Sequence, residues 1–543
     1  MHSVVAMLIV GVLGAAAEDV VVTTTLGRLR GSRVSTGPST YLDTFLGVPF
    51  AKPPVGSLRF ARTQPAEPWV GTRDAKNFGP ACPQQQQLPR FTTSEDCLTL
   101  NIYTHCSADC QAVPVMMWVH GGGFTQGSGM EVNGTELAMR GVVVVTVNYR
   151  LDILGFLSTG DDSCPGNYGL LDVIQALKWI KENIASFHGN PDDVTIFGES
   201  AGGALTSQLR ISPLTKGLIK KAIMESGVSV TPWGKSSPAI SLSRSQALAT
   251  KVGCPTDNGT AALVSCLKDQ PLDTLMAAAA AVRASGNFFG PVVETQFGVL
   301  PKPPEQLIQE GSGADIVSIR GTNRDEMAME FKLRANPQYN LQTAETEVMS
   351  SAATNFPRGP QEAGRALFKE YVQTIENPTS QQLATGVSQL QSDLAFNYPT
   401  IHETRLVVSN QSAARQYVYQ FSFLSPSSTM SEVPHAAEIP FVFGEPFGGQ
   451  SKWTDADRRV SNDVMTMWTN LAKYGKEEDK YGADDMSSVS RDPTPQGVSN
   501  ITWGAYYEAT QFYLRFQETP SLDNHLNQQR MDLLKSLYER FGA

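Results

Sequence analysis

The chain has 543 residues, of which 41% are hydrophobic and 18% are charged, and its formal net charge is −10. This composition is typical of a globular protein with a large core, and the acidic balance argues against nucleic acid or an anionic membrane surface as the main partner. No shift in composition divides the chain, so we expect a single domain over residues 18–543.

The N-terminus carries an apolar run from Val4 to Leu13, followed by three alanines that end at Ala17. This pattern predicts a signal peptide over residues 1–17. A membrane anchor is the alternative, but the run is shorter than the roughly 20 residues that a span needs. Neither a retention signal nor a lipid-anchor tail ends the chain. We therefore expect a secreted, extracellular protein with no stable membrane anchor.

Two further patterns agree with export. Four tripeptides match the acceptor motif for N-linked glycosylation, at Asn133, Asn258, Asn410 and Asn500. The seven cysteines of an exported chain favour disulfides over metal ligands. The pairs Cys82–Cys97 and Cys254–Cys266 would each close a short loop, and Cys106–Cys110 is a third candidate, which leaves Cys164 free or bonded to another chain. No Cys/His cluster lies near them, so no metal site is predicted.

Apolar runs alternate with helical patterns along the chain. Strands are predicted at residues 113–119, 142–147, 193–197, 221–225, 316–320 and 417–423, and helices at 167–187, from 201 onward and at 399–408. This alternation predicts an α/β fold with a mostly parallel central sheet and helices on both faces. Functional groups gather at the carboxyl ends of the strands in such sheets.

The first such group is a glycine loop, His120-Gly121-Gly122-Gly123-Phe124, directly after the strand that ends at Val119. Glycines let backbone N–H groups approach a developing oxyanion closely, and each donor can supply about 3–4 kcal/mol of transition-state stabilisation. A phosphate-binding loop is the alternative, but the Lys-Ser/Thr that usually follows such a loop is missing. We expect the N–H groups of Gly122 and Gly123 to be two donors of an oxyanion hole.

The second group is Gly198-Glu199-Ser200-Ala201-Gly202, between a predicted strand and a predicted helix. Its G-x-S-x-G spacing in this context predicts a nucleophile elbow that exposes the hydroxyl of Ser200. A glycine-rich turn with a solvated serine is the alternative. The N–H of Ala201 would be the third oxyanion donor.

A serine nucleophile needs a base and an acid that orients the base. In the chain order serine, acid, histidine, the candidate bases are His402, His435 and His525, and the loop position of His435 after a predicted strand favours it. The turn after the strand 316–320 contains Asp325 and Glu326, and the local sequence does not choose between them.

Taken together, these segments resemble the carboxylesterase/cholinesterase family of α/β-hydrolases. The resemblance covers most of the chain after residue 17 and includes the segments 45–54, 94–98, 147–150 and 189–202. It implies Glu326 as the triad acid and His435 as the base, and it supports the two disulfide pairs. It also implies roles at the site for Glu199, Ser226, Phe124, Phe288 and Phe289.

The chain departs from cholinesterases in one respect. The position of their choline-binding tryptophan falls at or near Gln87, in a segment without tryptophan or tyrosine, so the cation–π contact with a quaternary ammonium is missing there. The sequence therefore predicts a serine esterase of small carboxylic esters that is not choline-specific and that needs no metal or organic cofactor. A binding protein on the same fold and a lipase of long-chain esters are the alternatives.

Overall fold

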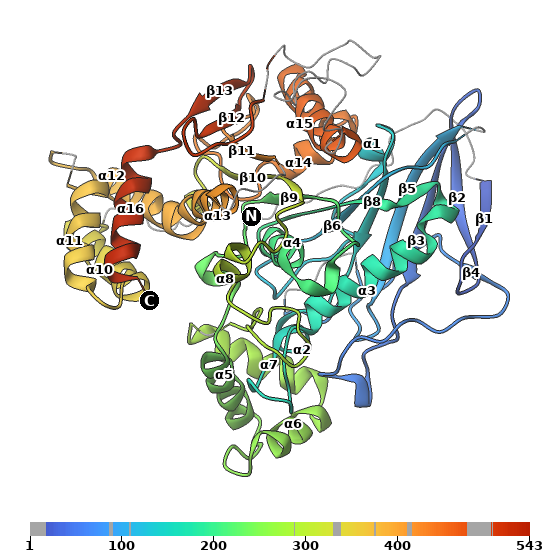
Figure 1. The fold of residues 1–543 in the computed structure, drawn as a ribbon, viewed down its shortest axis with the longest axis horizontal. Helices are drawn as coiled ribbons and strands as arrows, with labels where there is room; N and C mark the ends of the chain where they lie inside the picture. Colours follow the sequence, from blue (N-terminus) through green and yellow to red (C-terminus); the bar gives the residue numbers. More distant parts are fainter. Residues whose placement is uncertain are drawn as a thin grey trace.

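The computed structural model describes residues 18–85, 91–107, 110–286, 288–329, 338–373, 376–409, 415–474, 501 and 503–542. Within these residues, a 13-stranded mixed sheet crosses the molecule (Figure 1) in the order β1-β2-β3-β5-β7-β6-β8-β9-β10-β11-β12-β13, with β4 beside β2. Its strands are β1 Glu18–Thr23, β2 Arg28–Gly37, β3 Thr40–Pro49, β4 Thr72–Asp74, β5 Thr99–Ser107, β6 Val113–Val119, β7 Val143–Val147, β8 Gly189–Glu199, β9 Lys221–Glu225, β10 Val317–Asn323, β11 Gln416–Phe421, β12 Phe512–Phe516 and β13 Ser521–Asn524.

Helices connect most of the central strands. They are α1 Thr135–Ala138, α2 Asp152–Phe156, α3 Tyr168–Asn183, α4 Ala201–Ile211, α5 Pro238–Lys251, α6 Thr260–Asp269, α7 Leu272–Ala284, α8 Pro304–Gln309, α10 Leu341–Asn355, α11 Pro360–Tyr371, α12 Ser380–Ser392, α13 Tyr398–Ser409, α14 Ile439–Val442, α15 Asp455–Tyr474 and α16 Gln528–Phe541. A π-helical turn, η5 (Asp393–Asn397), joins α12 to α13. The predicted strands and helices all lie within a residue or a few of these elements.

The centre of the sheet is parallel, as predicted. The strands from β7 to β12 in the sheet order pair in parallel. Antiparallel strands that the sequence patterns did not reveal extend both edges: β1, β2, β3 and β5 on one side and β13 on the other. The parallel block places the carboxyl ends of β6, β8, β9, β10 and β11 along one edge, where the candidate residues lie.

Two layers of helices cover the central sheet because its strands are apolar on both faces. In β6, Met117 and Val119 lie in the same buried cluster as the apolar side chains of α3 and α4, whereas Met116 and Trp118 lie in the cluster that contains those of α15. This alternation follows from the two-residue period of a strand. Continuous hydrophobic strand sequences therefore indicate a sheet that is covered by helices on both faces.

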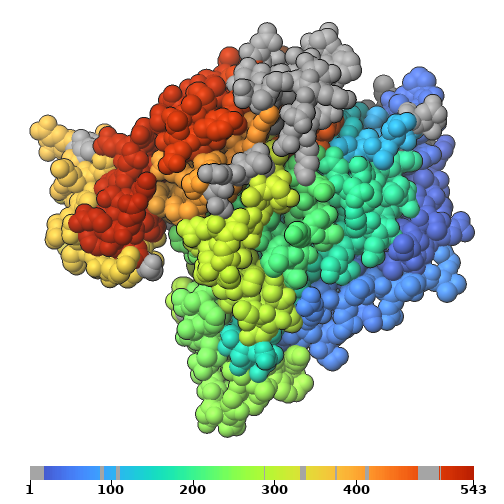
Figure 2. All heavy atoms as spheres, in the orientation of Figure 1, coloured from blue at the N-terminus to red at the C-terminus, as the bar shows by residue number. Residues whose placement is uncertain are grey.

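A helical lobe lies at one end of the molecule. Helices α10, α11, α12 and α16 form it around their own buried cluster, and the N-terminal strands lie at the opposite end (Figures 1 and 2). Two tyrosine rings, Tyr398 and Tyr538, stack with centroids 4.8 Å apart and join α13 to α16. No helix among the described residues is long and apolar enough to cross a membrane.

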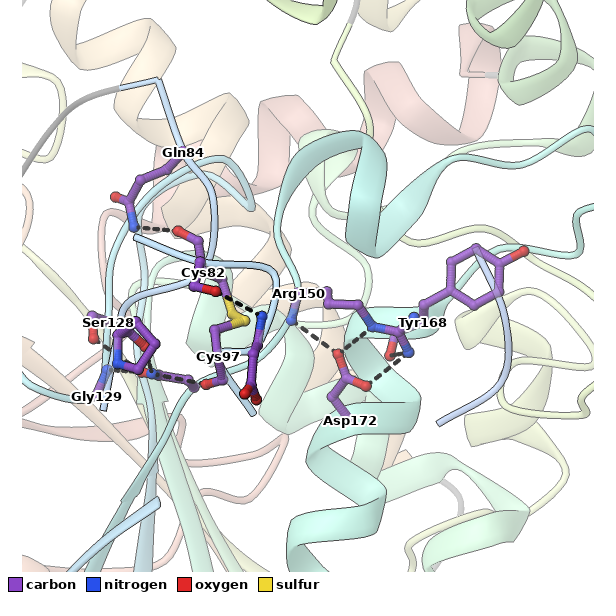
Figure 3. Close-up of a disulfide and its surroundings, with 12 residues drawn as sticks. Cys82, Gln84, Cys97, Ser128, Gly129, Arg150, Tyr168 and Asp172 are labelled. Atoms are coloured by element: carbon purple, nitrogen blue, oxygen red, sulfur yellow. Dashed lines mark hydrogen bonds and ion pairs between the residues drawn. A yellow bond between two sulfur atoms is a disulfide. The ribbon is translucent and has the colours of Figure 1, made fainter. Parts of the chain in front are cut away.

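The disulfides match the predicted pairs. Cys82–Cys97 and Cys254–Cys266 are both formed, Cys110 is also disulfide-bonded, and Cys164 is free and buried. The first disulfide lies beside the buried ion pair of Arg150 and Asp172, whose Nη2 and Oδ1 atoms are 2.8 Å apart (Figure 3). The side chain of Cys106, the predicted signal peptide, Gln87 and the sequons at Asn410 and Asn500 lie outside the residues described.

Candidate active site

Ser200 lies on a sharp turn between β8 and α4. Its φ of 56° and ψ of −122° are unusual for a residue with a side chain, and its N–H donates to the carbonyl of Glu225 over 2.8 Å. Residues held in such a conformation concentrate at functional sites. Glycine is required on both sides, because a Cβ at Gly198 or at Gly202 would lie within 2.5 Å of the carbonyl oxygen of Val119. The close packing of β8, α4 and the end of β6 therefore produces the predicted elbow.

The glycine loop lies against this turn. A Cβ on Gly121 would lie 3.1 Å from Cβ of Ser200, which measures how closely the two backbones approach. Gly122 and Gly123 have positive φ values of 99° and 62°, and the N–H groups of Thr125 and Gln126 both donate to the carbonyl of Gly122. In the described part of the chain, the N–H groups of Gly122 and Gly123 donate to no protein acceptor. The loop that carries these two N–H groups lies against the Ser200 turn.

We expect Gly122→Ala to lower kcat by about 10²–10³-fold, the usual effect of losing one oxyanion donor. A Cβ at this position would meet the carbonyl oxygen of Gln126 at 2.2 Å, so the loop has to move. Gly217→Ala is the matched control, because its φ is also positive, at 81°, while nothing lies within 4 Å of the new Cβ. Steady-state kinetics on a nitrophenyl ester compare them; equal activity in the two variants would contradict the role of the loop.

The structure brings His435 and Glu326 together. Nδ1 of His435 lies 2.6 Å from Oε2 of Glu326, and the other oxygen of Glu326 accepts hydrogen bonds from Oγ of Ser226 and N of Asn323, each over 2.7 Å. The side chain of Asp325 instead accepts from Arg324 and from N of Val433. Of the two acids left open by the local sequence, Glu326 is the one that contacts the imidazole.

The other two candidate histidines lie elsewhere. His402 is on α13, where its ring stacks on Tyr398 with centroids 5.5 Å apart. His525 lies between β13 and α16, before α16 begins at Gln528. His435 is thus the histidine that this geometry places beside a buried acid.

The second ring nitrogen of His435 faces the elbow. Its Nε2 lies 3.0 Å from Oε1 of Glu199, the residue next to Ser200. Burial raises the pKa of Glu199 to about 8, although the neighbouring His435 opposes the rise. Burial alone would lower the pKa of His435, but the charges of Glu199 and Glu326 outweigh it and raise this pKa to about 10. The two groups therefore titrate as a pair.

This pairing gives a pH prediction. A general base must be neutral, so activity falls as the pH drops below the pKa of His435. Glu199→Gln removes one of the charges that raise this pKa, so the acidic limb of the kcat/KM profile should move to lower pH by about one unit, where one unit corresponds to ~1.36 kcal/mol. Glu182→Gln, on the exposed face of α3, serves as the control. An unchanged acidic limb in Glu199→Gln would contradict the coupling.

The three aromatic residues predicted at the site differ in burial. Phe124 is buried against Phe156 and Trp233, at centroid distances of 5.4 and 6.1 Å. Phe289 is buried, but Phe288 is 43% exposed and lies under the guanidinium of Arg244. Phe288 is therefore at the surface, and only Phe124 and Phe289 are buried as a site wall would require.

A cavity of about 350 Å³ adjoins the glycine loop. Its walls include Gly121, Gly122, Gln84, Glu199 and Ile439. Sequence reasoning missed Gln84, whose amide nitrogen donates to the carbonyls of Cys82 and Gly127 over 3.1 and 3.0 Å. It lies in a glutamine-rich stretch that looks like a polar loop, so no local pattern distinguishes it.

Two buried carboxylates behind the site were also missed. Glu438 accepts a hydrogen bond from the side-chain amide of Asn323, and burial raises its pKa to about 7. Glu225 accepts from the indole N–H of Trp468 over 2.7 Å, and burial raises its pKa as well. Among the described residues, no group of three or more His, Cys, Asp or Glu side chains could hold a metal ion.

Known proteins resemble this chain over nearly its whole length. The family model described as "Carboxylesterase family" matches residues 18–534. The chain belongs to the carboxylesterase family. It is 34% identical to a medium-chain fatty acyl-CoA hydrolase precursor of Anas platyrhynchos, over 97% of this chain and 94% of that relative. It is also 34% identical to a cocaine esterase of Oryctolagus cuniculus, over 93% of each chain, and to carboxylesterase 3 of Homo sapiens, over 88% and 85%.

Membership of the carboxylesterase family confirms two predictions. The mixed sheet with helices on both faces is an α/β-hydrolase fold. The chain is a carboxylic ester hydrolase, and small-molecule esters are its substrates.

Proposed function

We propose that this esterase works through an acyl-enzyme intermediate, with Ser200 as nucleophile, His435 as base and Glu326 as the acid that orients His435. The observation that carries the proposal is the meeting of three elements at one edge of the sheet: the strained Ser200 turn, the glycine loop against it, and the Glu326–His435 pair. A further support is that Nε2 of His435 contacts Glu199, the residue that precedes Ser200 in the chain.

The proposed reaction has two stages. His435 accepts the proton of Ser200 as the hydroxyl attacks the ester carbonyl, and the N–H groups of Gly122, Gly123 and Ala201 bind the oxyanion. The imidazolium then protonates the leaving alcohol. His435 next takes a proton from water as the water attacks the acyl-enzyme, and it returns a proton to Oγ of Ser200 as the bond between Oγ and the acyl group breaks and the acid is released. The bond from Ser226 to Glu326 keeps the acid in place behind the imidazole.

We further propose that the enzyme is secreted after removal of residues 1–17 and prefers neutral esters to choline esters. The disulfides support an oxidising compartment. Of the two sequons that lie in the described residues, Asn258 is exposed and Asn133 is half-buried, so Asn258 is the better glycosylation site. Two of the relatives are named for fatty acyl-CoA and for cocaine, and neither name refers to a choline ester.

A substrate panel tests the proposal on the wild-type protein. Nitrophenyl esters of graded acyl length and choline esters of the same acids are compared by kcat/KM, and an organophosphate probe is followed by peptide mapping. We expect faster turnover of the neutral esters and a label on Ser200. A protein that neither turns over an ester nor takes the label would be a binding member of the fold, and a rate that jumps above the solubility limit of the ester would indicate a lipase.

A further inference from the structure

The helical segment that contacts His435 contains an irregular turn. Between α12 and α13, residues Asp393–Asn397 are π-helical, and the N–H of Tyr398 donates to the carbonyl of Asp393, five residues back. A π-helical turn has poorer geometry than an α-helical turn, and such turns are found mostly at functional sites. The extra residue in the turn changes which side chains point toward the sheet.

One of those side chains is Phe396, which packs on the imidazole of His435. The two ring centroids are 4.8 Å apart and the ring planes make an angle of 44°. Phe396 is 7% exposed, and its ring also contacts Trp233 at 5.7 Å. Trp233 in turn lies 6.1 Å from Phe124 of the glycine loop. An aromatic row therefore runs from the glycine loop to the base.

Hydrogen bonds fasten the turn to the elements that carry the site. The indole N–H of Trp233 donates to the carbonyl of Ala395 over 3.0 Å, and Oγ1 of Thr322, on β10, donates to Oδ1 of Asn397 over 2.6 Å. Just before the turn, Oγ of Ser392 accepts from N of Met327, the residue after Glu326, over 3.0 Å. The π-helical turn is thus fixed by contacts on two sides, with the aromatic row and with β10 and the residues that follow it, which include Glu326.

We propose that the π-helical turn makes Phe396 a positioning residue for His435. Glu326 and Glu199 contact the two ring nitrogens at the edge of the imidazole, and these contacts restrict the tilt of the ring plane less than a packing contact does. Contact with Phe396 limits this tilt and keeps Nε2 directed at the elbow. The inference rests on the proposed function, since it assigns a role to a residue that acts only through the base.

Phe396→Leu tests the inference, with Phe368→Leu as the matched control. Both phenylalanines are 7% exposed, but Phe368 lies in the buried cluster of the helical lobe, which His435 does not join. For Phe396→Leu we expect kcat on a nitrophenyl ester to fall by about 10- to 100-fold with little change in KM, because a misplacement of about 1 Å can cost ~10²-fold. We also expect a shifted acidic limb of the pH profile, which a loss of stability alone would not produce. Phe396→Tyr, which keeps the ring, should recover most of kcat.

Trp233→Phe gives a second, milder measurement. This variant keeps an aromatic ring and removes the hydrogen bond to the carbonyl of Ala395, so kcat should fall less than in Phe396→Leu. If Phe396→Leu does not fold, Trp233→Phe is the deciding test of the inference. With an active wild type, an unchanged kcat and pH profile in Phe396→Leu would overturn the inference. If Phe396→Leu does not fold, an unchanged kcat and pH profile in Trp233→Phe would overturn it. Absence of ester turnover by the wild type would instead refute the proposed mechanism, so the two failures are distinguishable.

Discussion

Ser200→Ala is expected to lower kcat for a nitrophenyl ester by about 10⁶-fold, the size of effect that loss of the nucleophile produces in a serine hydrolase. The reason is geometric, since the elbow offers a single hydroxyl beside the glycine loop. The residual rate comes from the oxyanion donors and from substrate binding. The variant should also lose labelling by an organophosphate probe.

The matched control is Ser186→Ala. Ser186 is exposed, and its hydroxyl donates to the carbonyl of Thr23 far from the site. Both variants should keep the wild-type circular dichroism spectrum and melting temperature within a few degrees. Rapid ester turnover by folded Ser200→Ala would remove Ser200 from the mechanism and direct the search to another nucleophile.

The second large effect concerns the acid. Glu326→Gln should lower kcat by about 10⁴-fold, because an amide can present its N–H₂ group to Nδ1 and favour the wrong imidazole tautomer, as the corresponding change does in serine proteases. Asp325→Asn is the matched control one residue away. Its carboxylate contacts Arg324 and N of Val433, and not the imidazole.

Parallel measurements of kcat and melting temperature separate the two acids. We expect Asp325→Asn to keep kcat within about tenfold of the wild type, since surface ion pairs such as Arg324–Asp325 contribute ~0–1 kcal/mol. A larger loss of activity in Asp325→Asn than in Glu326→Gln would show that the contact to His435 does not report the working acid.

Much of this fold could be predicted because its strands are apolar on both faces. Runs such as Val113–Val119 and Val143–Val147 do not alternate between polar and apolar residues, and this pattern distinguishes buried parallel strands from edge strands. The antiparallel edges have mixed sequences. In β2, Arg28–Gly37, charged and polar residues dominate, so no period of two could mark it as a strand.

The candidate site also contains features that the sequence predicts and features that it does not. The glycine loop and the Ser200 turn are contiguous in sequence, and their backbone requirements mark them. The contact of His435 with Phe396 depends on one extra residue in a helical turn, and the contact with Glu199 depends on how β8 and the His435 loop pack. Both contacts join segments that are separated in the sequence and meet only in the folded chain, so local patterns in one sequence do not reveal them.

The amide of Gln84 joins the Cys82 backbone to the loop that carries Gly122 and Gly123 (Figure 3 shows its bond to the carbonyl of Cys82). Asn148 makes a second connection of this kind, because its side chain donates to the carbonyl of Cys97 and accepts from N of Gly129. The backbone on both sides of the Cys82–Cys97 disulfide is therefore tied to the segment that follows the glycine loop.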